Sequence, residues 1–198
     1  CELRLRCSPA RDQMGHKAAL AGQVDVGRQC ALCDGWLPAC VLQPERESSR
    51  GEGRMFEILL FHHALGRTPG FLAFADTLRR AGHTVHTPDL FAGRVFDRLE
   101  DGLAHAQRIG FEEIAERGVR TAQNLPSSLV YAGVSLGVMP AQKLAMTRPE
   151  ARGALLLEAC VPLQYFGGAW PAEVPVQIHG MDRDPVFAGD GDLDAAQA

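Results

Sequence analysis

The 198-residue sequence lacks three features that would assign it to a specialised class of protein. No run approaches the ~18 consecutive apolar residues of a membrane-spanning helix, so we expect no membrane-embedded segment. The net charge of −4 gives no indication of the basic surface that nucleic acids require. No basic segment followed by an apolar one opens the chain, so a secretory signal is not indicated and we expect a cytoplasmic protein.

Cysteine is almost absent from the second part of the chain. Five of the six cysteines lie in residues 1–54, and only Cys160 lies beyond them. Apolar residues in 1–54 show no helical or strand-like spacing over a useful window, so we expect a disordered leader, with Met55 as the natural first residue. The C-x-x-C pair Cys30 and Cys33 leaves a zinc-linked interaction module as the alternative, although structural zinc sites normally carry two such pairs.

Residues 55–198 alternate between strand-like and helix-like patterns. The predicted strands are residues 56–61, 84–88, 129–133, 153–158 and 174–179, and the predicted helices are 69–81, 99–108, 111–124 and the segment from about 138 to 146. This alternation predicts one α/β domain in which a parallel sheet is covered by helices on both faces. The final residues, 190–198, have the composition of a helix start, so we expect the domain to be incomplete at its C-terminus.

The sequence after the first predicted strand argues against a dinucleotide-binding fold. Such a fold needs G-x-G-x-x-G between the first strand and the following helix. Residues 62–70 are His-His-Ala-Leu-Gly-Arg-Thr-Pro-Gly, which do not match that pattern. We therefore expect no dinucleotide, and we expect the chain to use neither another cofactor nor a metal.

The motif that indicates chemistry is Gly133-Val-Ser135-Leu-Gly137, a G-x-S-x-G between a predicted strand and a predicted helix. In that context the motif is typical of a nucleophile elbow, a tight turn that holds its serine in a strained backbone conformation. Small residues two positions before and after Ser135 avoid clashes, and the adjoining helix N-terminus favours developing negative charge. The alternative is a glycine-bracketed turn whose serine only caps the helix.

A serine nucleophile needs a base and an acid that orients the base. In the order Ser–acid–His of the α/β-hydrolases, the acid lies in the loop after the fifth predicted strand. That loop contains Asp184, which precedes a proline and is our first choice, and Asp182, our second. None of the seven histidines follows Asp184, and His179, which precedes the acid, is expected to be structural or to line a pocket.

Other residues allow two interpretations each. Trp170, on a glycine-rich loop, either lines a pocket or anchors that loop. His62 and His63 follow a buried strand, so at least one is expected to point into the core or the mouth of the site. Cys160 is expected to be a small buried hydrophobe.

Residues 55–198 resemble the dienelactone hydrolase family of α/β-hydrolases, in particular its small bacterial members. The resembling segments are residues 57–66, 86–94, 131–137 and 174–180. The resemblance implies a three-layer fold and a metal-free hydrolase of small-molecule esters or lactones, monomeric or homodimeric, acting through an acyl-enzyme intermediate. The alternatives are a broad carboxylesterase without lactone preference and a non-catalytic α/β domain.

The resemblance also implies roles for individual residues. Ser135 takes the nucleophile position, which is a cysteine in the dienelactone hydrolases proper, and this favours general esterase chemistry over the lactone reaction. The backbone N–H groups of Ala64 and Leu136 would bind the oxyanion. Arg94 matches the region where such enzymes hold a substrate carboxylate, and His63 stands where they carry a glutamate.

In the resembling family the triad histidine follows one further strand. That position lies beyond residue 198, so we expect the general base, the last strand and the last helix to be missing from this chain. Loss of that strand would leave one edge of the sheet uncovered.

Overall fold

The computed structural model describes residues 2–7, 23–27, 55–181, 184–189 and 191–197. Strands and helices alternate from residue 57 onward, as the sequence pattern predicts. The elements are β3 (Glu57–Phe61), α1 (Pro69–Arg80), β4 (Thr84–His86), α2 (Leu99–Ile109), α3 (Phe111–Ala122), β5 (Val130–Val134), the 3₁₀ turn η1 (Ser135–Gly137), α4 (Val138–Thr147), β6 (Gly153–Leu157), the 3₁₀ turn η2 (Leu163–Phe166), β7 (Val176–Met181), α5 (Pro185–Gly189) and α6 (Asp192–Gln197).

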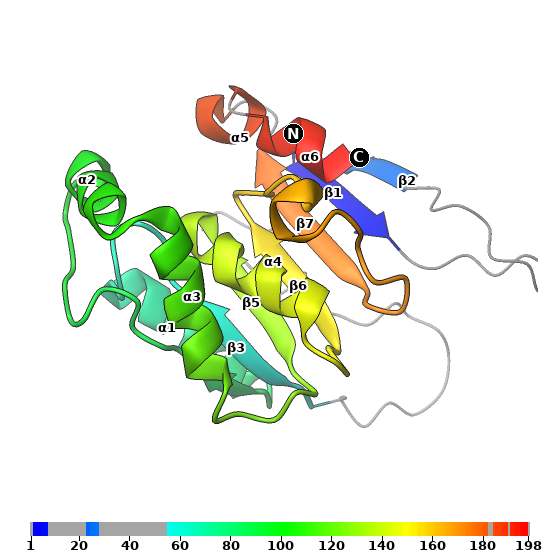
Figure 1. The fold of residues 1–198 in the computed structure, drawn as a ribbon, viewed down its shortest axis with the longest axis horizontal. Helices are drawn as coiled ribbons and strands as arrows, with labels where there is room; N and C mark the ends of the chain where they lie inside the picture. The colour runs from blue at the N-terminus through cyan, green and yellow to red at the C-terminus, as the bar shows by residue number, and fades with distance from the viewer. Residues whose placement is uncertain (1, 8–22, 28–54, 182–183, 190, 198) are drawn as a thin grey trace, which may run out of the picture.

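The sheet contains five parallel strands in the order β7-β6-β5-β3-β4 (Figure 1). The strand β5 is therefore central, with β3 and β4 on one side of it and β6 and β7 on the other. All five strands finish at the same edge of the sheet because they are parallel. The predicted α/β fold, a parallel sheet covered by helices on both faces, is confirmed.

Two separate hydrophobic clusters fill the two faces of the sheet. One cluster joins alternate strand residues such as Leu60 and Leu155 to the buried side of α1, which carries Phe71, Ala75 and Leu78. The other joins the intervening strand residues to α3, α4 and α5, and includes the fully buried Tyr131. Figure 1 shows α3 and α4 in front of the sheet and α1 behind it.

The leader region differs from the expectation in two segments. β1 (Glu2–Cys7) pairs antiparallel with the outer edge of β7, and β2 (Gln23–Gly27) pairs antiparallel with β1. The expectation that 1–54 lacks structure is therefore wrong for these two segments, and the edge of β7 is paired by β1. An unpaired strand edge presents a row of free N–H and C=O groups, which a further strand satisfies. The Cys30–Cys33 pair lies outside the described residues.

The helix α1 begins where the sequence predicts. The side chain of Thr68 accepts a hydrogen bond from the N–H of Phe71 at 3.2 Å, and Pro69 occupies the first helical position. Gly82 ends the turn with φ +95°, a conformation that favours glycine. These local signals fix the start of α1 directly behind the loop that follows β3.

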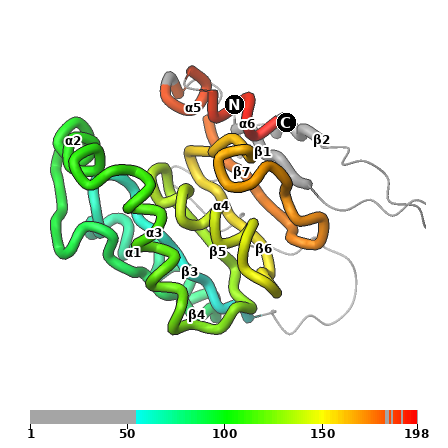
Figure 2. Tube along the Cα trace, in the orientation of Figure 1, coloured from blue at the N-terminus to red at the C-terminus, as the bar shows by residue number. Residues whose placement is uncertain are grey.

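Two short helices, α5 and α6, follow the carboxyl end of β7. Phe187 of α5 is buried against Gly180, where a methyl group would overlap the Phe187 ring. In Figure 2, α2 and α5 lie beyond the end of the sheet at which the parallel strands finish. Among the helices that the structure describes, none combines the length and the apolar character that crossing a bilayer requires.

Helices α3 and α4 approach each other closely at a single small residue. A Cβ atom added at Gly118 would overlap the ring of Pro140 and touch that of Phe61. We predict that Gly118→Ala lowers the free energy of unfolding by about 1–3 kcal/mol, since overpacking forces the helices apart. A Cβ atom at Gly70, in the first turn of α1, would make only an ordinary contact at 4.0 Å with Thr68 Oγ, so Gly70→Ala should be neutral or stabilising by about 0.5–1 kcal/mol. Equal effects of the two substitutions in urea denaturation would contradict this account.

Candidate active site

Ser135 lies at the tight turn between β5 and α4. Val134 is the last residue of β5, Ser135 opens η1, and α4 comes directly after it. The backbone of Ser135 has φ +49°, which makes it one of four non-glycine residues with positive φ in the described part of the chain. Such a conformation costs on the order of 1–3 kcal/mol and persists only where the surroundings impose it. The predicted strand–turn–helix context and strained backbone are therefore both present.

The two glycines of the motif are required by close backbone packing. A side chain at Gly133 would overlap the carbonyl group of Gly137. A side chain at Gly137 would overlap the backbone of Phe61 and the carbonyl oxygen of His62. The turn after β5 is therefore packed directly onto the end of β3, which places Ser135 beside the loop that begins at His62.

The two predicted oxyanion donors lie on either side of this contact. Leu136 is in the first turn of a helical segment, where N–H groups have no acceptor within the helix. Ala64 is fully buried in the loop after β3, and its carbonyl group is packed against Gly102 of α2. Among the hydrogen bonds of the described turns and loops, none uses the N–H of Ala64 or Leu136 as donor. This placement is compatible with their predicted role.

His62 links the loops that follow β3 and β4. Its side chain is fully buried, and Nε2 accepts a hydrogen bond of 3.0 Å from the N–H of Leu90. The proton is therefore on Nδ1, which donates to the carbonyl oxygen of His63 at 2.8 Å. Burial lowers the pKa of His62 and keeps the imidazole neutral. Because both ring nitrogens are engaged, His62 is structural.

His63 holds the same loop against the start of α1. Its Nδ1 accepts from the N–H of Leu65 at 3.1 Å, and its Nε2 lies 3.4 Å from the hydroxyl of Thr68. The side chain is half-buried, and burial lowers its pKa. His63 thus shapes the loop that carries Ala64, and a contact with substrate stays a prediction.

Asp184, the preferred acid, follows the carboxyl end of β7. Its Oδ1 accepts hydrogen bonds from the N–H groups of Val186 at 2.8 Å and Phe187 at 3.4 Å, so it caps α5. The cap fixes the carboxylate at the edge of the sheet where Ser135 lies. Asp182, the second choice, lies outside the described residues, so the choice between the two stays open.

His179 lies in β7, in register with the last residues of β6 and β5. It pairs with Leu157, which pairs in turn with Val134. Its side chain is buried, and its carbonyl oxygen accepts from the N–H of Glu158 at 2.7 Å. This buried position near the carboxyl edge of the sheet is compatible with the structural role expected from the sequence.

Trp170 and Arg94 differ in how they relate to this edge. The indole N–H of Trp170 donates to the carbonyl oxygen of Val174 at 2.7 Å, just before β7 begins. Because β7 begins at the edge opposite Ser135, this contact favours the loop-anchor interpretation of Trp170 over pocket lining. The backbone carbonyl of Arg94 packs against Gly66, next to Ala64, and the side chain of Arg94 is exposed.

One contact of the loop after β6 is absent from the sequence-based prediction. The fully buried Gln142 of α4 donates from Nε2 to the carbonyl of Val161 at 2.6 Å and accepts from its N–H at 2.9 Å. This double hydrogen bond fixes the loop to α4. Cys160 in the same loop is buried, as predicted, and burial together with the carboxylate of Asp192 raises the pKa of its thiol to about 12, so Cys160 is not a thiolate at neutral pH.

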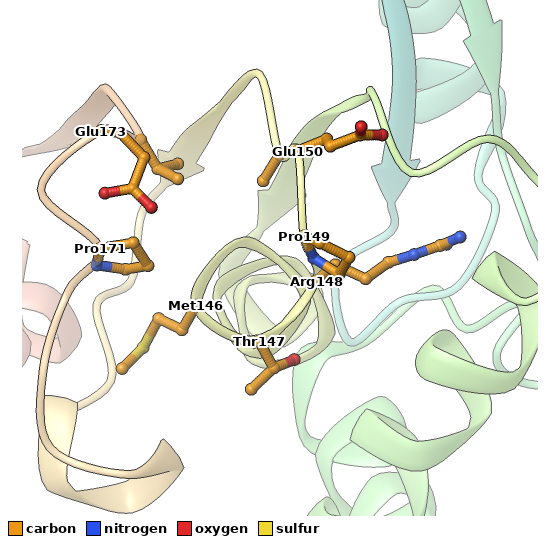
Figure 3. Close-up of a pocket in the computed structure, with 9 residues that line it drawn as sticks. Met146, Thr147, Arg148, Pro149, Glu150, Pro171 and Glu173 are labelled. Atoms are coloured by element: carbon orange, nitrogen blue, oxygen red, sulfur yellow. The ribbon is translucent and has the colours of Figure 1, made fainter.

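A pocket of ≈ 270 Å³ lies at the opposite end of α4 from Ser135. Figure 3 shows Met146, Pro171 and Glu173 facing one another across it, whereas Arg148 and Glu150 point away. The hydroxyl of its Thr147 donates to a carbonyl of its own helix at 2.7 Å. Ten residues of α4, about 15 Å, separate the pocket from the turn. It offers no activated nucleophile, and we therefore place the candidate active site at Ser135.

No family model matches the chain. Among solved structures, the chain is similar to a protein of Xanthomonas campestris pv. campestris that is provisionally described as a hydrolase of the α/β superfamily. The identity is 17% over 72% of this chain and 94% of the other, with a TM-score of 0.36.

The packing of the turn predicts the effect of enlarging Gly137. Gly137→Ala should lower the free energy of unfolding by about 1–3 kcal/mol or more, because the added methyl group meets backbone atoms, which cannot move aside as a flexible side chain can. Gly93→Ala is the control: a Cβ atom at Gly93 would meet no other atom, although the backbone there has positive φ. Thermal unfolding of both variants checks the prediction, and a loss at position 137 no larger than at position 93 would contradict it.

The buried His62 predicts a pH dependence of stability. Its pKa in the folded protein is below the ordinary 6.5, so it contributes stability that is fully present above pH 6.5 and is lost as the pH falls toward the lowered value. His62→Gln does not titrate. The difference in free energy of unfolding between the wild type and this variant should therefore shrink when the pH is lowered from 7.5 to 5. A difference that stays constant over this range would show that His62 is not held neutral.

Proposed function

We propose that this protein hydrolyses carboxylic esters or lactones, with the Oγ atom of Ser135 as nucleophile. The observation that carries the proposal is the strained turn, with positive φ at Ser135 between two glycines that admit no side chain. A serine that only caps a helix needs no such conformation, whereas a nucleophile elbow uses it to expose the hydroxyl at the edge of the sheet.

In the proposed first step, Ser135 Oγ attacks the ester carbonyl while a general base takes its proton. The carbonyl oxygen becomes an oxyanion that the N–H groups of Ala64 and Leu136 stabilise. The tetrahedral intermediate then collapses, and the protonated base gives its proton to the departing alcohol. Water attacks the acyl-enzyme in the second step, returns the free acid and regenerates the serine. These steps require no group other than the triad, the two N–H donors and water.

We propose Asp184 as the acid that orients the base, since it is fixed at the end of β7. The base itself is neither His62 nor His63, whose ring nitrogens are already engaged by the loop. In the resembling family the triad histidine follows a later strand, and we propose that a histidine in that position acts as the base.

A carboxylesterase without lactone preference is the second candidate. Two observations favour it: Ser135 replaces the thiol of the resembling family, and the side chain of Arg94 is exposed. The choice between lactones and open-chain esters changes the substrate but not the roles proposed for Ser135 and Asp184.

The nucleophile is tested by replacing it. Ser135→Ala in the full-length protein should lower kcat for p-nitrophenyl acetate on the order of 10⁴- to 10⁶-fold and abolish covalent labelling by a fluorophosphonate. Ser127→Ala is a matched control, since that serine is bound to Glu150 at the other edge of the sheet. Retained labelling in the Ser135 variant would remove the assignment. Absence of labelling in the wild type would favour a non-catalytic domain.

The acid is tested by a substitution that keeps its structural contact. The Oδ1 of an asparagine at position 184 still accepts from the N–H groups of α5, so Asp184→Asn should change stability by less than about 0.5 kcal/mol. Loss of the negative charge that orients the base should lower kcat by about 10³- to 10⁴-fold. Asp194→Asn on the exposed side of α6 is the control. An unchanged kcat at position 184 would leave Asp184 as a cap and make Asp182 the candidate.

A further inference from the structure

The helix α2 presents apolar side chains to solvent. Leu99 and Leu103 are 46% and 38% exposed, and Val95 in the preceding loop is 49% exposed. The two leucines are four residues apart and therefore share one side of the helix. We call these three residues the α2 apolar patch.

The α2 apolar patch adjoins the proposed oxyanion site. Gly102, next to Leu103, is the residue of α2 that packs against the Ala64 carbonyl. On the other side of the patch, Phe96, which follows Val95, donates its N–H to the carbonyl oxygen of Leu65 at 3.0 Å. The patch is thus fixed directly beside the loop that carries the N–H group of Ala64.

The order of the strands determines which part of an ester would meet the patch. The departing alcohol must receive a proton from the base, and the proposed acid that orients the base follows β7. The alcohol therefore leaves on the β6–β7 side of β5. The acyl group then extends to the opposite side, where β3, its loop and α2 lie.

We propose that the α2 apolar patch binds the aliphatic acyl chain of the ester, and that the substrates are neutral esters of short to medium fatty acids. This inference depends on the proposed function and adds its substrate class. Arg94, which the resemblance associates with a substrate carboxylate, has an exposed side chain, and its backbone carbonyl lies close to Gly66.

The size of the patch suits an acyl chain better than a protein partner. Burying a whole leucine or valine removes roughly 60–120 Å² of apolar surface, so these three partly exposed side chains offer on the order of 120 Å². A stable dimer buries about 800 Å² on each partner. At roughly 30 Å² for each methylene, the patch matches about four methylenes, which corresponds to a hexanoyl group.

The experiment compares p-nitrophenyl acetate, butyrate, hexanoate and octanoate with the full-length protein. For the wild type, kcat/KM should rise roughly two- to fourfold for each methylene up to hexanoate and then level off. The double variant Leu99→Ser, Leu103→Ser should flatten this rise, and Leu103→Phe, which adds apolar surface, should steepen it. Phe111→Ser, with a side chain as exposed as that of Leu103, should leave the rise unchanged.

Three results would overturn the proposal. The first is that the rise in kcat/KM is unchanged in the double variant and also in Leu103→Phe, while circular dichroism shows that the double variant is folded. Mono-p-nitrophenyl adipate, the hexanoate chain with a terminal carboxylate, is hydrolysed faster than the hexanoate. Sedimentation shows a wild-type dimer that the double variant dissociates without altering the rise. In each case the proposed function would still hold if the wild type hydrolyses p-nitrophenyl acetate and Ser135→Ala does not. If the wild type hydrolyses none of the four esters, both the acyl-chain proposal and the proposed function are wrong.

Discussion

Contact between the turn after β5 and the end of β3 determines the geometry of the candidate site. Gly137 lies against the backbone of Phe61 and His62, and Gly133 lies against Gly137, so neither position can accommodate a side chain. The positive φ of Ser135 results from this packing, because the turn must reverse direction within the few residues between strand and helix. The strain is local, and the strands β3 and β5 that carry it are deeply buried.

A second set of contacts holds in place the loop that carries Ala64. His62 joins the loop after β3 to the loop after β4 through Nε2, and its Nδ1 binds the carbonyl of His63. His63 joins the loop after β3 to Thr68 at the start of α1, and Gly102 brings α2 against Ala64. Most of these hydrogen bonds end on backbone groups, so they orient peptide units rather than side chains. Orientation of peptide N–H groups is what stabilisation of an oxyanion requires. A neutral, buried imidazole is suited to this task because it offers one donor and one acceptor at fixed angles.

The sequence predicted those features that depend on local patterns. The strands from β3 to β7, the helices α1 to α4 and the context of Ser135 are indicated by apolar periodicity and by the glycines of one short motif. Leu3 and Leu5 alternate with charged residues, which is typical of a strand. The strand β1 was missed because the rest of residues 1–54 lacks such spacing and because its pairing with β7 joins segments far apart in the sequence. The hydrogen bonds of Gln142 to Val161 join residues 19 positions apart, and the hydrogen bond from Leu90 that sets the tautomer of His62 joins residues 28 positions apart. No local sequence signal indicates either contact. The sequence likewise left two interpretations of Trp170, because the edge of the sheet at which it lies depends on where its loop joins β7.

The central claim is that one turn brings a nucleophile and two oxyanion donors together, and a crystal structure of the full-length protein after reaction with a fluorophosphonate tests it most directly. The account predicts phosphorus bonded to Ser135 Oγ, with one phosphonate oxygen about 3 Å from the backbone nitrogens of both Ala64 and Leu136. An adduct on another residue, or one at Ser135 whose oxygens point only to solvent, would contradict it.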